Sequence, residues 1–405
     1  MGSPEFFVQT MVLMVPHIIS AAPFSLAGGL SWVLWNIWVY YARARFLASQ
    51  KYVLLEMRLP ENIYKSPLAM EVVLDALHQT GGESTWYDRL IRGKVRPHFS
   101  LELVSLEGQV KFFLRTREGL RQIVENQIYS QYPDIEIYTV PDYTTRIRFG
   151  KEGSDWAVWA SEFELSKPNV FPIKTYIDYG LNKESVEEEQ KIDPITPMIE
   201  FLGSLGRGQQ VWYQLIIRAG KGKDDKTGYW HYDLKDEVKK EIEEMTKPDP
   251  VNEGEIPKEK KLTSQDKRII EALEKSLQKR WFDCGMRAVY LARKDVFNGT
   301  HVPAMLGVVK QYSSPDLNGF KPKNVTDVDY PWQDISQKKR AQMKESLFDA
   351  YRRRSWFFPP YERKPFVLNA EEIATIYHFP GGVAQTPTFG RVESKKAEPP
   401  INLPL

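Results

Sequence analysis

The sequence predicts an α+β protein with an N-terminal transmembrane helix, two tandem ferredoxin-like (βαββαβ) units and an α-helical, extended C-terminal segment. Three observations lead to this prediction. The chain starts with a long stretch without charges, two runs of strand and helix patterns follow, and the end is rich in basic residues, Gly and Pro. The predicted regions are a membrane anchor at 1–46, a first unit at 47–150, a second unit at 151–330 with an insertion at 219–262, and a C-terminal segment at 331–405.

The predicted anchor is the N-terminal apolar stretch. Phe6 to Ala42 contains no Lys, Arg, Asp or Glu, and Phe24 to Ala42 alone is long enough to cross a bilayer, which takes about 20 apolar residues. Aromatic residues and then arginines follow, which predicts that the C-terminal body lies in the cytoplasm. The predicted contacts with the lipid bilayer are Trp32, Trp35, Trp38, Tyr40, Tyr41, Arg43 and Arg45.

Two other interpretations of this stretch stay open, namely a buried core helix and a cleaved signal peptide. Ser20-Ala21-Ala22 resembles a cleavage site, but the start carries Glu5 and no basic residue, unlike a signal peptide. Residues 1–6 also resemble a cloning remnant, so the native start stays open.

Composition limits the classes of partner and site. The chain has 55 basic and 53 acidic residues, so polyanion binding would need a local patch. The single cysteine, Cys284, excludes an intramolecular disulfide framework and a cysteine-rich zinc site. We predict that it is a small core residue and not a nucleophile.

Local patterns define the elements of the first unit. Alternating apolar residues predict strands, apolar residues spaced by three and four predict helices, and Glu107-Gly108 between two strand patterns predicts a hairpin turn. The expected strands are 52–59, 98–106, 109–117 and 135–140, and the expected helices begin at Ser66-Pro67 and span 120–128.

The second unit repeats this order of strands and helices and contains additional inserted segments. Thr263 and Asp266 resemble a capping box that starts a helix, and residues 247–261 form a linker rich in Pro and charge. The expected strands are 157–165, 171–177, 211–218 and 285–293, and the expected helices are 194–205, 234–245, 263–277 and 302–312.

The C-terminal segment contains the candidate contact residues. A basic helix is expected at 336–354, an aromatic loop follows it, and Asn369 with Glu372 predicts a capped helix. The basic cluster could contact nucleic-acid phosphates and bases, could contact anionic lipid head groups, or could be a solvated helix face. The possible polyanion or partner contacts are Lys338, Lys339, Arg340, Arg352, Arg353, Arg354 and Trp356.

The chain lacks the common catalytic patterns. It contains no G-x-x-x-x-G-K-[ST] phosphate loop, no H-E-x-x-H metal motif and no G-x-S-x-G nucleophile turn. We therefore predict no enzyme activity, no cofactor and no metal site in this chain.

Six short motifs carry a family resemblance. Together they resemble the stretch that precedes the motor domain in bacterial membrane-anchored DNA-translocating ATPases, the conjugative coupling-protein and HerA-like proteins of type IV secretion. The motifs are Ala350 to Arg354, Lys364 to Asn369, Glu371 to Thr375, His378 to Pro380, Thr386-Pro387 and Lys395 to Pro400.

This resemblance implies a non-catalytic structural and assembly module of a type IV secretion-like DNA-translocation machine, anchored in the bacterial cytoplasmic (inner) membrane with its C-terminal body in the cytoplasm. The module would form a homo-oligomer and would dock or precede a hexameric ATPase, in cis or in trans, without an ATPase domain of its own. No catalytic residue can be carried over. Two alternatives stay open: an inner-membrane platform protein of a pilus or secretion system with its body outside the cytoplasm, and a nucleic-acid-binding module that contacts DNA through the basic helix.

Overall fold

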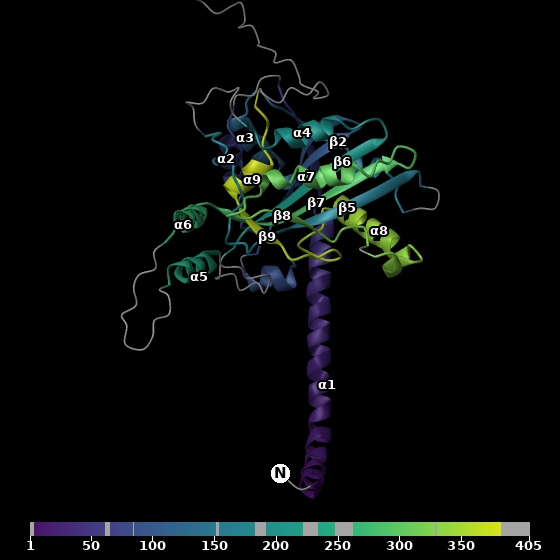
Figure 1. Ribbon diagram of the computed structural model, residues 1–405. Helices are drawn as coiled ribbons and strands as arrows, with labels where there is room; N and C mark the ends of the chain where they lie inside the picture. Colours follow the sequence, from purple (N-terminus) through teal and green to yellow (C-terminus); the bar gives the residue numbers. More distant parts are fainter. Residues whose placement is uncertain are drawn as a thin grey trace, which may run out of the picture. The chain divides into compact units, whose positions relative to one another are not determined.

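The computed structural model describes residues 4–60, 65–83, 85–150, 154–182, 192–221, 234–247, 262–328 and 330–381, with side chains from residue 23 onward except at 331. The predicted linker and the last two motifs of the resemblance lie outside these residues. The chain divides into two compact units (Figure 1). The helical unit comprises Met1–Lys51 and Gly81–Arg96, and the sheet unit comprises Tyr52–Thr80 and Pro97–Leu405.

The helical unit consists of helix α1, Pro4–Ser49, and a short segment that contains the π-helix η1, Tyr87–Ile91. The indole Nε1 of Trp38 donates a 3.1 Å hydrogen bond to the carbonyl of Leu90. Gly93 has a φ of 63°, and a Cβ there would lie 2.2 Å from the backbone carbon of Ala42. Only glycine therefore allows the segment to approach α1 so closely.

Among the described residues, no helix is long and apolar enough to cross a membrane. This finding contradicts the predicted transmembrane anchor and the predicted inner-membrane location. Many residues counted as apolar in the prediction are Trp and Tyr, and Ser31 and Asn36 interrupt them, so the described part of α1 is less apolar than an aliphatic span. Of the predicted anchor residues, the tryptophans, the tyrosines and Arg45 are exposed or bonded within their own unit, and Arg43 is half-buried.

The sheet unit is built on one antiparallel sheet with the strand order β4-β1-β3-β2-β6-β7-β5-β8, in which β9 also pairs with β7. The strands are β1 Tyr52–Arg58, β2 His98–Leu106, β3 Gln109–Arg117, β4 Glu136–Val140, β5 Trp156–Leu165, β6 Gln209–Ala219, β7 Trp281–Arg293, β8 Phe320–Lys323 and β9 Phe366–Asn369.

The prediction of two tandem ferredoxin-like units is wrong, because the strands form one continuous sheet. β2 pairs with β6 along its whole length, from His98 opposite Arg218 to Leu106 opposite Gln210. A strand at an open edge carries unpaired backbone N–H and C=O groups. Here β2 and β6, which would be edge strands of two separate units, form hydrogen bonds with each other through these groups. The predicted domain bounds stay predictions.

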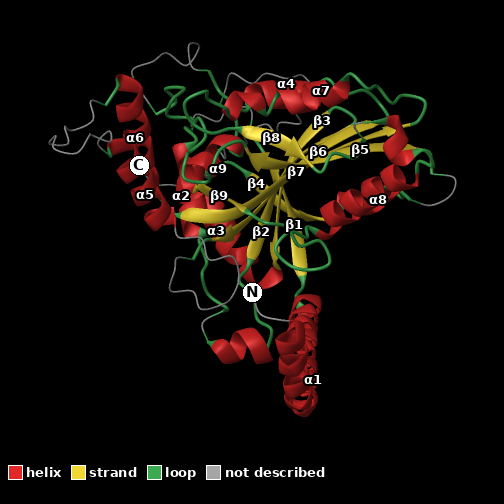
Figure 2. Ribbon diagram, turned by 60° about the horizontal axis from the view of Figure 1, so that its bottom comes forward, coloured by secondary structure: helices red, strands yellow, loops and turns green. Residues whose placement is uncertain are grey.

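Helices cover both faces of the sheet, as Figure 2 shows for α4 and α7 on one face and α8 on the other. The apolar core on the first face includes residues of α2 Leu68–Ala76, α3 Arg121–Gln131, α4 Thr196–Gly203, α7 His301–Gly307 and α9 Ala370–Ile376. The second face packs against α8, Lys338–Arg353, and α5 Leu234–Thr246 packs with α6 Ser264–Leu277. Short 3-10 turns are η2 Glu118–Leu120, η3 Tyr143–Arg146, η5 Lys310–Tyr312 and η6 Pro331–Asp334.

Several local predictions can be compared directly with the structure. The capping boxes at Thr263 and Asn369 are confirmed, and so is the burial of Cys284. The predicted strand at 171–177 is wrong. There the backbone N–H of Ile173 donates to the Glu372 carboxylate at 2.8 Å and that of Lys174 donates to the carbonyl of Tyr312 at 3.0 Å, so these groups do not enter a sheet ladder.

Candidate functional site

The second face of the sheet carries a row of buried polar residues across four neighbouring strands. Glu102 lies opposite Gln214, Gln214 opposite Arg287, and Arg287 opposite Glu162. We call these four residues the polar row. None is more than 2% exposed. Buried charges are costly unless they are paired, so the row requires partners from elsewhere in the chain.

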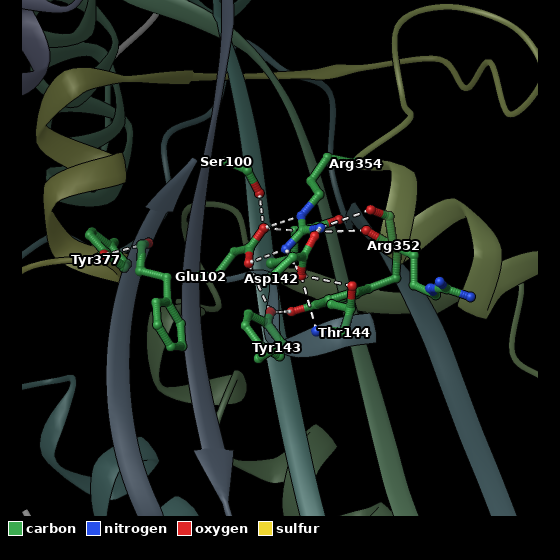
Figure 3. A network of polar contacts seen from close by, with 11 residues as sticks. Ser100, Glu102, Asp142, Tyr143, Thr144, Arg352, Arg354 and Tyr377 are labelled. Carbon is green, nitrogen blue, oxygen red and sulfur yellow. Dashed lines mark hydrogen bonds and ion pairs between the residues drawn. The ribbon is translucent and has the colours of Figure 1, made fainter. Parts of the chain in front are cut away.

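Arg354, the residue that ends α8, is the main partner of Glu102 (Figure 3). Its Nε and Nη2 donate to the two Glu102 carboxylate oxygens at 2.8 and 3.1 Å. Nη2 also donates to Asp142 at 3.1 Å, and Nη1 donates to Asp142 and to the carbonyl of Arg352. The guanidinium therefore joins two carboxylates from different segments in a bidentate geometry that is strong for this ion pair.

Hydroxyl and amide groups complete the environment of Glu102. Ser100 donates to its Oε1 at 2.6 Å, and Tyr143 donates to its Oε2 at 2.8 Å. The hydroxyl of Tyr143 also lies 2.7 Å from that of Tyr351 on α8, and Gln214 donates to both Glu102 and the Tyr351 carbonyl. The network fixes the end of α8 on the sheet, and Glu102 itself is fully buried within it.

The charge of Arg354 sets the protonation of both carboxylates. Burial raises the pKa of Glu102, but the facing Arg354 charge and the hydrogen bonds outweigh burial and hold that pKa below its usual value. The same balance lowers the pKa of Asp142. Both carboxylates are therefore ionised at neutral pH.

Acid should destabilise the sheet unit through these two groups. Because their folded-state pKa values are lowered, their stabilisation is present above the ordinary values of 4.5 and 3.8 and disappears as pH falls through the lower folded-state values. We expect the denaturant midpoint of the wild type to fall more steeply below about pH 4.5 than that of Asp142→Asn. Parallel midpoint curves for the two proteins from pH 7 to pH 2 would contradict this assignment.

An aromatic loop covers two further cations of this face, Arg287 and Arg218. We call residues 355–358 the cover loop. The Arg287 guanidinium lies 4.8 Å from the ring centroid of Trp356 and donates to the Ser355 carbonyl at 2.7 Å. Arg218, which pairs with Asp283 at 2.6 Å, lies 4.3 Å from the ring of Phe357. Desolvated cation–π contacts of this kind stabilise buried guanidinium groups.

The structure buries some residues of the predicted basic cluster and leaves others exposed. Arg354 and Trp356 are buried in the network and the cover loop, so neither is on a surface that a polyanion could reach. Arg340 pairs with Asp327 and Asp334, and Arg353 pairs with Asp349. The exposed residues are Lys338, Lys339, Arg352 and Arg353, and their role in polyanion or DNA binding stays a prediction.

The described residues of the sheet unit enclose at least two cavities. The larger, of about 420 Å³, lies between α6 and the start of α9, where Glu371 accepts from Thr175 at 2.6 Å and pairs with Lys275 at 3.2 Å. The smaller, of about 250 Å³, includes Glu162 of the polar row and Trp356 of the cover loop among its lining residues. Within the described part of the chain, no group of His, Cys, Asp and Glu side chains is arranged to hold a metal ion.

Sequence reasoning missed the polar row. Each member sits at an alternate strand position, where Glu, Gln and Arg normally indicate a solvent-facing side. The available signal was the aromatic run Trp356 to Phe358 directly after a triple arginine. That run can cover a polar sheet face, but periodicity does not show which face.

A family model described as a domain of unknown function (DUF8128) matches residues 48–391. No curated protein matches the chain. Neither comparison supports type IV secretion, conjugation or a coupling-protein assignment. The resemblance in the C-terminal motifs stays a prediction.

Proposed function

We propose that this chain, which belongs to the DUF8128 family of domains of unknown function, is a non-catalytic assembly module that associates with copies of itself through helix α1. The observation that supports this proposal is the exposed apolar surface of α1. Trp32 is 69% exposed, and other large apolar residues along the helix are exposed to a similar degree. These residues are Phe24, Leu26, Leu30, Val33, Leu34, Trp35 and Ile37.

Exposed apolar residues on this scale mark an interaction site. Single exposed apolar residues are ordinary on soluble proteins, whereas large continuous patches indicate protein–protein contact. α1 has 46 residues and is about 70 Å long, and its exposed large apolar side chains extend from Phe24 to Ile37 in the part with described side chains. A helix that is apolar on all sides requires partners on more than one side.

A second copy of the chain is a suitable partner for α1. The helix has no Lys, Arg, Asp or Glu from Phe6 to Ala42, so identical copies can pack with little repulsion between like charges. A Cβ added at Gly28 or Gly29 would meet nothing within 4 Å, which leaves room for close helix approach. The buried and mutually paired charges of the sheet unit further support a structural role over a catalytic one.

Sedimentation equilibrium of the full chain tests the proposal. We expect the wild type to self-associate, and Trp32→Glu with Trp35→Glu to lower the association constant at least about tenfold, or ~1.4 kcal/mol. Trp332→Glu is the matched control, because Trp332 is 68% exposed in the sheet unit and should leave association unchanged. A wild type that stays monomeric at all concentrations, or an equal effect of both substitutions, would refute the proposal.

A further inference from the structure

The two ends of the sheet differ in how their edge strands are protected. β4 and β8 are the first and last strands of the order, and among the described strands each pairs on one side only, β4 with β1 and β8 with β5. An edge strand with free N–H and C=O groups can pair with another chain, and proteins commonly block such edges with Pro and Lys.

Strand β8 is blocked in this way. The N–H of Ser166 donates to the carbonyl of Gly319 at 2.8 Å, so Gly319 points its backbone groups to β5. Because these directions alternate along a strand, Lys321 and Lys323 also point to β5, and Pro322 points outward. A further strand would therefore meet a residue without an N–H, between two lysine side chains that are 52% and 53% exposed.

The register of the ladders shows which backbone groups of β4 point outward. Leu106 and Gln109 flank the two-residue turn of the hairpin, so they form a hydrogen-bonded pair. The residues of β3 then point alternately to β2 and to β1, which directs Leu114 to β1, opposite Leu55. Leu55 therefore points to β3, and its neighbour Glu56 points to β4.

Ile137 and Thr139 are the outward residues of β4. Glu56 lies opposite Tyr138, so Tyr138 points its backbone groups to β1, and the residues on either side of it point away from the sheet. Among the described residues, the outward N–H and C=O groups of Ile137 and Thr139 have no hydrogen-bond partner. β4 contains no Pro and no Lys, and Tyr138 is 42% exposed, so this edge lacks the protection of β8.

We propose that β4 pairs with β4 of a second copy of the chain, in an antiparallel ladder centred on Tyr138. This two-fold arrangement places Ile137 opposite the partner's Thr139, so the outward donors and acceptors of both residues meet their complements. A shift by one residue would set them opposite residues that point to β1. Tyr138 then faces the partner's Tyr138 as a cross-strand aromatic pair.

The charges of β4 also fit self-pairing. Glu136 is the only charged residue of the strand, and the two-fold register sets it opposite the partner's Val140 and not opposite a second carboxylate. Like charges directly opposite each other would be destabilising. The contact is closed by its symmetry and gives a dimer. It belongs to the sheet unit and does not involve α1, so this proposal and the proposed function can fail separately.

Cysteine crosslinking of the full chain tests the register. Cys284, the only cysteine, is buried, so an introduced cysteine is the accessible thiol. In Tyr138→Cys the two substituted positions form a non-hydrogen-bonded pair with Cα atoms about 4.5 Å apart, which a disulfide spans. In Thr139→Cys, the matched control, the two Cα atoms would be roughly 8 Å apart, too far for a disulfide.

Copper–phenanthroline oxidation, followed on non-reducing gels, measures the rate of crosslinking. We expect Tyr138→Cys to form a disulfide-linked dimer at least about tenfold faster than Thr139→Cys. No linked dimer of Tyr138→Cys, or equal rates for the two variants, would overturn the proposal.

Backbone variants in the Tyr138→Cys chain provide the second test. Thr139→Pro removes an outward N–H without touching the ladder to β1, so it should slow crosslinking at least about tenfold. Thr139→Ala keeps this N–H and should leave the rate within about twofold. The denaturant midpoint of each variant checks that the sheet unit is intact, and equal rates in intact variants would overturn the proposal.

The same measurement separates this interface from the one proposed for α1. Crosslinking through Tyr138→Cys should persist when Trp32→Glu and Trp35→Glu are added. Its loss in that chain would show that association of α1, and not pairing of β4, brings these residues together.

Discussion

Replacing Arg354 with alanine is expected to lower the free energy of unfolding of the sheet unit by about 3–5 kcal/mol, as is typical when one partner of a buried ion pair is removed. The substitution leaves Glu102 as a fully buried carboxylate without its main counter-charge, and it also removes the connection to Asp142. The denaturant midpoint, followed by near-UV circular dichroism, measures the loss.

The neighbouring Arg353 is the matched control for this change. Its side chain is 60% exposed and pairs with Asp349 one helical turn away at 2.7 Å. Such exposed helix pairs contribute about 0.3–0.5 kcal/mol, so Arg353→Ala should barely move the midpoint. Similar losses for the two variants would mean that Arg354 stabilises only as part of the helix end and not through Glu102.

Replacing Gly285 with alanine is expected to cost about 3 kcal/mol, the upper end of what overpacking of a core usually costs. A Cβ at this position would lie 2.1 Å from the indole ring of Trp356, which is packed over the sheet by the cover loop. The ring would have to leave its place, and its contact with Arg287 would be lost with it. Equilibrium denaturation measures the effect.

Two variants separate this steric effect from the general effect of removing a glycine. Gly307, at the end of α7, has nothing within 4 Å of an added Cβ, so Gly307→Ala should be neutral or stabilising by up to about 1 kcal/mol. In a Trp356→Leu background the penalty of Gly285→Ala should shrink, because the ring is absent. An unchanged penalty in that background would show that the indole is not the obstacle.

Local structure was predictable because its determinants are adjacent in the sequence. The strand bounds 98–106 and 109–117 match β2 and β3, since alternation and the turn at Glu107-Gly108 are local signals. Both capping boxes depend on residues three positions apart, and they too form as expected. β8 and β9 were missed because four residues are too few to show a period.

Contacts between segments far apart in the chain were not predictable from the sequence. Alternation shows that β2 and β6 are strands, but it does not show that their edges pair, so one sheet was predicted as two units. The triple arginine indicated a solvated helix end, yet the left-handed φ of 52° at Arg354 ends α8 there, and its guanidinium meets Glu102, 252 positions earlier. The sequence therefore singled out Arg354 and Trp356 as possible polyanion contacts, and it did not show that they are buried against the polar row.

The ladder between β2 and β6 has a mechanical consequence. Proteins built from two separate lobes commonly open and close about a flexible connection. Here the strands on either side of the ladder share one continuous hydrogen-bonded backbone from Ser100 opposite Ile216 to Val104 opposite Trp212 and beyond. Separating the two halves at this ladder would break these bonds, so hinge opening of the sheet unit at this position is disfavoured.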